Sequence, residues 1–267
     1  MKRFSVFCVL LLVSATAWAG ISYDYSTVTT GEGGPGQRMV GKSVVDGANM
    51  RIDVTEGDGI LFQSGAIVIS NDGGKTLLMS DPKTKTYYEL PLEQLFGALG
   101  AMLQSMGGMM EMSIENHKMT VTPEGAGGKI EGYPCVKYTV DSSYDVKIKV
   151  MGMAMDSHVN SKSQVWATDE LAQDYMTFVQ ERGFRTGIEG IDELIEKQMS
   201  AMKGFPLKMI TDSDTTFRGR NQKTTTTMTI SNVKEVNPPA STFEMPDDYS
   251  EGEAPTMQMP GMEKRRR

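Results

Sequence analysis

Cysteine is almost absent from this chain of 267 residues, which contains only Cys8 and Cys135. Cys8 lies in an apolar N-terminal run and lacks the small neighbours of a lipidation site, so we expect no lipid anchor. Once that run is removed, Cys135 has no partner and an intramolecular disulfide is excluded. A lone cysteine in a strand-like stretch is more often a buried hydrophobic side chain than a nucleophile, and we predict burial.

Histidine is equally scarce, with His117 and His158 as the two examples. Neither has a neighbour at metal-ligand spacing, and no nucleophile and base recur in a recognisable catalytic pattern. The sequence therefore predicts a protein without cofactor or metal, and one that is not an enzyme.

Long hydrophobic runs are also lacking. The longest, residues 4–13, is about half of what a bilayer-spanning helix needs. It follows Lys2 and Arg3 and precedes Ala17 and Ala19, which form an A-x-A cleavage site. We predict that residues 1–19 are a signal peptide cleaved after Ala19. The mature chain would be periplasmic, or secreted, without a transmembrane segment.

Positive charge is in deficit. The chain has 27 basic and 34 acidic residues, and cleavage removes Lys2 and Arg3, which leaves 25 against 34 and a net charge of −9. Nucleic-acid binding needs clustered positive charge and is therefore excluded as a function class. The basic run at residues 264–267 ends the chain and indicates a solvated tail.

One motif suggests a nucleotide site. Residues 36–43, from Gly36 to Lys42 and Ser43, match the phosphate-loop pattern G-x-x-x-x-G-K-S. A phosphate loop joins a buried strand to a helix, whereas Ser43 is followed by Val44, Val45 and an Asp-Gly turn. We interpret residues 43–47 as a strand that ends in a turn, and not as part of a nucleotide site.

Alternation of apolar and polar residues predicts a mainly β (α+β) domain over residues 20–249. Met50, Ile52 and Val54 alternate with charged neighbours, which is typical of a half-buried strand. Strands at 66–70 and 76–80 flank the turn signal at 71–74, and strands resume from about 109 to 165 and again near 224–230. From residue 250 the chain has no periodicity, and we predict a disordered tail that contains Met and Arg.

Helical periodicity interrupts the strands three times. Residues 91–106 place large apolar side chains on one face, with Pro91 in the first turn and Gly97 and Gly100 opposite. A second helix is predicted from Thr168 as N-cap to Gly183, and a third over residues 188–203. Because glycine destabilises a helix by about 1 kcal/mol relative to Ala, the first helix needs packing on several sides, or else moves.

Methionine is unusually common, with 22 residues clustered at 102–112, at 151–155 and in the tail. Three interpretations stay open. Met257, Met259 and Met262 have thioethers suited to Cu(I). The other clusters are typical of an adaptable apolar surface, or of side chains that fill gaps in a core.

Five stretches together resemble a family of uncharacterised exported bacterial domains. They are Met50-Arg51-Ile52-Asp53, residues 77–87 with Asp81 and Lys85, residues 128–138 around Tyr133-Pro134-Cys135, Val165-Trp166-Ala167-Thr168-Asp169, and residues 241–249. This family resembles the LolA/LolB-like superfamily of lipoprotein carriers. The resemblance implies a curved antiparallel sheet, a half-barrel, with helices on or lidding its concave face.

We hypothesise that the concave face and the first helix enclose a site for an acyl chain, a lipid or a lipidated protein. The candidate lining residues are Leu92, Leu95, Phe96, Leu99, Met102, Leu103, Met106, Met151, Met153 and Met155. For the last three, we expect side chains opposite to Val146, Ile148 and Val150 on a single strand. The rival hypothesis is a non-enzymatic structural or interaction module that binds an envelope protein.

Overall fold

The computed structural model describes residues 20–31, 36–58, 62–92, 110–150, 153–171 and 189–253. Within these ranges the chain is mainly β, as the sequence predicts. One α-helix, α3 (Glu189–Ala201), and two short 3₁₀-helices, η1 (Asp169–Leu171) and η2 (Ala240–Phe243), accompany the strands. No helix in the described part of the chain is long and apolar enough to cross a membrane.

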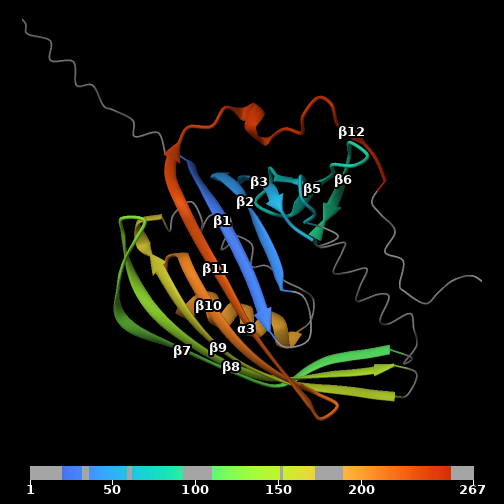
Figure 1. Cartoon of the computed structure of the whole chain (residues 1–267), viewed down its shortest axis with the longest axis vertical. Helices are drawn as coiled ribbons and strands as arrows, with labels where there is room; N and C mark the ends of the chain where they lie inside the picture. Colours follow the sequence, from blue (N-terminus) through green and yellow to red (C-terminus); the bar gives the residue numbers. More distant parts are fainter. Residues whose placement is uncertain are drawn as a thin grey trace, which may run out of the picture.

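Twelve strands form one large, curved, open sheet (Figure 1). They are β1 (Gly20–Gly31), β2 (Gln37–Asp46), β3 (Asn49–Glu56), β4 (Ile67–Ser70), β5 (Thr76–Asp81), β6 (Thr86–Pro91), β7 (Met110–Ile130), β8 (Tyr133–Val150), β9 (Met153–Thr168), β10 (Phe205–Phe217), β11 (Arg220–Val236) and β12 (Ser250–Glu251). Their order is β12-β6-β5-β4-β3-β2-β1-β11-β10-β9-β8-β7, antiparallel except for the short parallel pair of β12 and β6.

The N-terminal and C-terminal parts of the domain meet in the middle of the open sheet, because β1 pairs with β11. The first and last long strands of the sequence are thus neighbours, and residues 205 apart in the chain, such as Tyr25 and Ile230, face each other. Irregular pairing bends the sheet at its β7 edge, where the register between β7 and β8 shifts at three places. Such bulges increase local twist and strand curvature.

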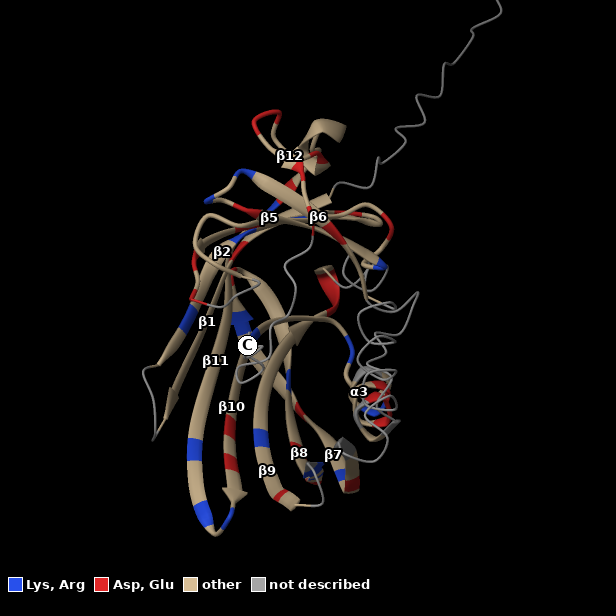
Figure 2. Cartoon of the chain, turned by 90° about the vertical axis from the view of Figure 1, so that its right-hand side faces the viewer, with Lys and Arg blue, Asp and Glu red and all other residues tan. Residues whose placement is uncertain are grey.

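Helix α3 defines an inner face of the sheet. It lies on one side of β7 and β8 (Figure 2), and its Leu194 packs with Met119, Val140 and Val165. Register relates these side chains to Tyr25 on β1 and to Ile52 and Val68 on β3 and β4, which lie on the same face. We call this side the inner face and its opposite the outer face.

The predicted helices have different outcomes. The third, at 188–203, is confirmed as α3. The second begins where predicted, since the Glu170 amide donates to Thr168 Oγ1 at 3.3 Å and η1 follows, but its remainder lies outside the described residues. For the first, Pro91 is still a strand residue, opposite Thr76. Helical geometry starts only at Leu92, and residues 93–109 lie outside the described ranges. The lid helix over residues 91–106 therefore stays a prediction.

The C-terminal segment crosses the outer face of β3–β6. Phe243 is buried against Ile67 and Ile69, whose side chains point away from the inner face. Arg51 Nη1 donates to the carbonyl oxygens of Thr242 at 3.1 Å and Glu244 at 3.3 Å. The segment ends in β12, so residues 250 and 251 form a strand at the point where the sequence predicts the start of the disordered tail.

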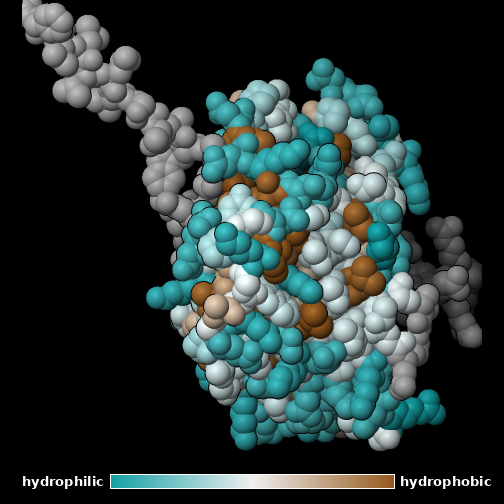
Figure 3. All heavy atoms as spheres, turned by 60° about the vertical axis from the view of Figure 1, so that its left-hand side comes forward, coloured by the Kyte–Doolittle hydropathy of each residue, from teal (hydrophilic) through white to brown (hydrophobic). Residues whose placement is uncertain are grey.

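The surface seen in Figure 3 is mostly hydrophilic, with hydrophobic side chains in small separate groups. Sequence alternation explains this distribution, because successive residues of a strand point to opposite faces. Large exposed hydrophobic side chains among the described residues are Met153 and Phe217.

Candidate functional site

An apolar strip on the inner face is the described part of the site that the sequence analysis proposed. It covers the ends of β8 and β9 that lie farthest from the buried core. Its half-buried members are Ile114, Tyr144, Val146, Ile148, Met155 and Val159, and it ends at the exposed side chains of Met153 and Phe217. We name this set the apolar strip.

Register shows that these side chains share one face. Ile148 lies opposite Met155, Val146 opposite Ser157, and Tyr144 opposite Val159. Directly opposed residues in an antiparallel pair have their side chains on the same side. The next pair, Ser157 and Phe217, continues the row onto β10.

The predicted orientation of the methionines was wrong. Alternation along the chain predicts one strand over 146–155, with the methionines opposite to the valines. Instead the chain reverses between β8 and β9, and Met153 pairs with Val150. Because of this reversal, even-numbered residues of β8 and odd-numbered residues of β9 point to the same face. Met153 and Met155 therefore lie with Val146 and Ile148 on the inner face. Gly152, between two methionines, is the turn signal that could have revealed this.

Among the other candidate residues, the structure describes Leu92, and it does not bring this residue together with the strip. Leu92 follows β6, near the opposite end of the strand order from β9, and its amide donates to the Lys75 carbonyl at 2.9 Å. Leu95, Phe96, Leu99, Met102, Leu103, Met106 and Met151 lie outside the described residues. The sequence prediction missed six members of the strip, because each belongs to it only through cross-strand pairing: Ile114, Tyr144, Val146, Ile148, Val159 and Phe217.

Small hydroxyl side chains separate the apolar strip from the buried core on β1 and β2. Their Oγ atoms are paired across strands: Ser142 with Ser161 at 2.7 Å, Ser163 with Thr211 at 2.8 Å, and Thr29 with Thr226 at 2.9 Å. Since each hydroxyl already has a partner, the band is polar without presenting unsatisfied groups. It gives the inner face an apolar end and a hydroxyl-lined middle.

The hydroxyl of Tyr25 is buried above this band, with no hydrogen-bond partner among the described residues. Burial raises the pKa of Tyr25 to about 12, with further contributions from the charges of Asp53 and Tyr23. Its ring covers Gly41, where a Cβ atom would lie 2.6 Å from the phenolic oxygen. Ser43, two residues on, is also buried within β2. The strand interpretation of the phosphate-loop pattern is therefore confirmed.

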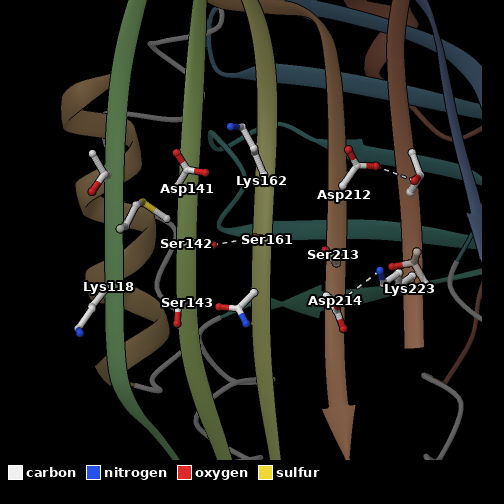
Figure 4. A pocket seen from close by; sticks show the side chains of 15 residues that line it. Lys118, Asp141, Ser142, Ser143, Ser161, Lys162, Asp212, Ser213, Asp214 and Lys223 are labelled. Atoms are coloured by element: carbon white, nitrogen blue, oxygen red, sulfur yellow. Dashed lines mark hydrogen bonds and ion pairs between the residues drawn. The ribbon is translucent and has the colours of Figure 1, made fainter. Parts of the chain in front are cut away.

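A polar groove of ≈ 610 Å³ lies on the outer face, across β7 to β11 (Figure 4). Its charged side chains alternate in sign from strand to strand, with Lys162 opposite Asp141 on one side and Asp212 on the other. Thr225 donates to Asp212 Oδ1 at 2.6 Å, and Lys223 Nζ lies 3.9 Å from Asp214. Outward-pointing side chains dominate the lining, so this groove is a polar surface and not the apolar cavity that was predicted.

The histidines and Cys135 have structural environments. His117 Nε2 lies 2.6 Å from Glu193 Oε2, and His158 Nδ1 lies 2.6 Å from Asp145 Oδ1. No group of three potential metal ligands occurs within the ranges that the structure describes. Cys135 is buried, as predicted, and burial raises the pKa of its thiol, which disfavours the reactive thiolate.

Trp166 lies on the outer face. It sits between Val165 and Ala167 in sequence, both of which are buried on the inner face. The ammonium groups of Lys137 and Lys208, its direct cross-strand neighbours, lie 5.3 Å and 5.2 Å from its ring centroid. Its fluorescence therefore reports on this cation–π stack and not on the apolar strip.

Comparison with known proteins identifies the family. The model of the "Domain of unknown function (DUF4412)" family matches residues 35–249, and the chain belongs to this family. The predicted membership in an uncharacterised domain family is thus confirmed. No curated protein matches the sequence.

Distant solved structures resemble the chain. A LolA superfamily protein from Nitrosomonas europaea has 9% identity and a TM-score of 0.31 over 85% of this chain and 90% of its own. An uncharacterised conserved protein from Thermus thermophilus has 9% identity and a TM-score of 0.34 over 86% and 89%. MucB in complex with MucA(peri) has 6% identity and a TM-score of 0.22 over 82% and 94%. Likeness at this level assigns neither ligand nor partner.

Proposed function

We propose that this chain is a non-enzymatic binding or carrier protein that holds an apolar ligand, an acyl chain or a lipidated partner, against its inner face. The observation that carries the proposal is the apolar strip. Its side chains come from four neighbouring strands, share one face, and are only half buried, with Met153 65% exposed. Contiguous exposed apolar surface is typical of a binding site.

The physical basis is the hydrophobic effect. Each methylene group transferred from water into an apolar site contributes about 0.8 kcal/mol. The binding free energy of an acyl chain therefore depends on the apolar area that it buries, and few polar contacts are needed. Thioethers such as those of Met153 and Met155 adapt to ligands of different shape. Beyond the strip, the hydroxyl band offers groups that can re-pair with a ligand head group.

An exported location is part of the proposal. β1 begins at Gly20, the residue that follows the predicted cleavage site, and its first residue already pairs with Val236. A mature chain that starts there keeps the whole of β1. The buried Cys135 and the absence of a second cysteine after cleavage are compatible with an oxidising compartment.

A second candidate function is the envelope interaction module. The observation that favours it is the outer groove, whose mixed charges suit a polar protein surface. Cu(I) binding by Met257, Met259 and Met262 remains a separate proposal for residues outside the described ranges; deletion of 250–267 should then abolish competition with a Cu(I) chelator.

The carrier proposal is tested by expressing the full chain in a bacterial periplasm, purifying it without detergent, and extracting it for lipid mass spectrometry. We expect lipid or fatty acid in stoichiometric amount. An empty protein that also fails to bind an acyl probe would refute the carrier function and favour the interaction module.

A matched pair of variants locates the site. Met155→Glu puts a charge into the apolar strip, whereas Ala154→Glu puts the same charge on the exposed outer side of the same strand. We expect co-purified lipid to be lost in the first variant and retained in the second. Equal lipid content in both, with thermal unfolding unchanged, would place the ligand elsewhere.

A further inference from the structure

The hairpin between β10 and β11 ends in a rigid tip with an exposed aromatic side chain. Arg218 and Gly219 form its turn, with φ values of 49° and 75°. Two consecutive positive φ values are typical of the two-residue hairpin turn that matches strand twist. Thr216 Oγ1 donates to Asn221 Oδ1 at 2.7 Å across the hairpin, and Phe217 pairs with Arg220. The tip thus presents Phe217 in a defined position.

Phe217 is 41% exposed and belongs to the inner face. Its cross-strand neighbour is Ser157, which in turn faces Val146 on β8 and lies in the same row as Ile114 on β7. The strands β9 and β10 run antiparallel, so the start of β9 at Met153 is at this same end of the sheet (Figure 1). The two large exposed hydrophobic side chains of the described chain therefore occupy one end of the molecule.

The turn of the hairpin also carries two arginines, Arg218 and Arg220. The guanidinium of Arg218 lies 5.2 Å from the Phe217 ring, and neither Arg218 nor Arg220 forms an ion pair with any described residue. Figure 2 shows the basic residues at the tip of this hairpin. The whole chain has a net charge of −7, so a cationic tip is a local departure from its charge balance.

We propose that the β10–β11 tip docks on an anionic phospholipid surface. Phe217 would enter the interfacial region while Arg218 and Arg220 contact lipid phosphates, a combination that binds membranes better than either element alone. A lipid surface fits better than a polar macromolecule, because the strip behind Phe217 is apolar and gains most from a hydrocarbon neighbour. Docking would bring the open end of the apolar strip to the bilayer; this role in ligand transfer rests on the proposed carrier function.

The test is co-sedimentation of the full chain with vesicles of phosphatidylglycerol and phosphatidylcholine, compared with phosphatidylcholine alone. We expect binding to the anionic vesicles that weakens at high salt. Arg218→Gln with Arg220→Gln should lower the affinity roughly thirtyfold, since each arginine near an anionic surface contributes about fivefold. Phe217→Ser should lower it about tenfold. Lys75→Gln, an exposed cation on the β4–β5 turn, is the charge control and should bind normally.

Two results would overturn the proposal: a wild-type chain that does not bind anionic vesicles, or Phe217→Ser and double-arginine variants that bind as wild type. Light scattering identifies a different occupant, because self-association that disappears in Phe217→Ser without vesicle binding would assign the tip to a second copy of the chain. The carrier function is tested separately, by the amount of co-purified lipid. Met155→Glu should lose co-purified lipid but still bind vesicles, whereas the double-arginine variant, which leaves the apolar strip intact, should keep its lipid and bind vesicles weakly.

Discussion

His117 on β7 and Glu193 on α3 are joined by a contact of 2.6 Å between Nε2 and Oε2. His117 follows Asn116, whose φ of 51° marks the bulge that interrupts the pairing of β7 with β8. The bulge therefore turns a side chain of an edge strand toward the helix. This contact and the packing of Leu194 hold α3 against the inner face.

Removing this contact should loosen α3. Because both side chains are partly exposed, Glu193→Gln is expected to lower the free energy of unfolding by less than about 1 kcal/mol. Amide exchange in α3 should nevertheless accelerate, while exchange in β10 and β11 stays unchanged. Glu196→Gln, exposed on the same helix, is the control, and equal acceleration in that variant would contradict the assignment.

Gly190 sets the closeness of α3 to β7. A Cβ atom there would lie 2.8 Å from Ile114 Cβ and 3.0 Å from the Ile114 carbonyl oxygen. Gly190→Ala should therefore displace the helix and destabilise the protein by about 1–3 kcal/mol, despite the higher helix propensity of alanine. Urea unfolding measures the difference, with Ser200→Ala on the exposed side of α3 as control. A stabilised Gly190→Ala protein would show that the helix packs less closely.

Arg51 should hold the C-terminal segment. Its guanidinium binds the Asp53 carboxylate and two backbone carbonyls, an arrangement that lysine cannot reproduce. Arg51→Lys is expected to cost about 1–3 kcal/mol and to expose residues near 237–253 to protease. Arg38→Lys alters an exposed ion pair with Glu56 and should cost less than about 1 kcal/mol. Similar proteolysis of both variants would argue against the anchoring role.

Asp145 should make stability depend on acid pH. The Asn116 amide, and after it His158, hold the pKa of this carboxyl below its ordinary value. A carboxyl whose pKa is lowered by folding stabilises the protein above its unfolded value of about 3.9, and this contribution is lost as pH falls through the lower, folded pKa. Asp145→Asn should thus be less stable than wild type at neutral pH, and the difference should vanish in strong acid. The measurement is the urea midpoint of unfolding as a function of pH. Asp141→Asn, a substitution on the same strand, is the control.

A tryptophan in the apolar strip should report ligand binding where Trp166 does not. Tyr144 is half buried in the strip, so Tyr144→Trp in a Trp166→Phe background should shift its emission to the blue when an acyl probe binds. The wild-type protein, whose Trp166 is stacked with Lys137 and Lys208 on the outer face, should respond little. A large response from wild type and none from the variant would move the site to the outer face.

Several features follow from the sequence alone. Period-2 alternation around Met50, Ile52 and Val54 and the turn signals between strands are local, and they predicted β3, β4 and β5 correctly. The third helix was also recoverable, because the 3.6-residue period of Ile191, Leu194 and Ile195 is contained within one segment. The burial of Cys135 followed from its place in a strand.

The apolar strip was decided by tertiary structure. Successive residues of a strand point to opposite faces, and a single chain reversal between β8 and β9 inverted the assignment of Met153 and Met155. Phe217 joins Ile114 only through three cross-strand pairings that span more than a hundred residues. Composition and local periodicity determine that this chain forms a mostly β domain. Strand order and register, which depend on contacts between distant segments, decide which of its apolar side chains meet.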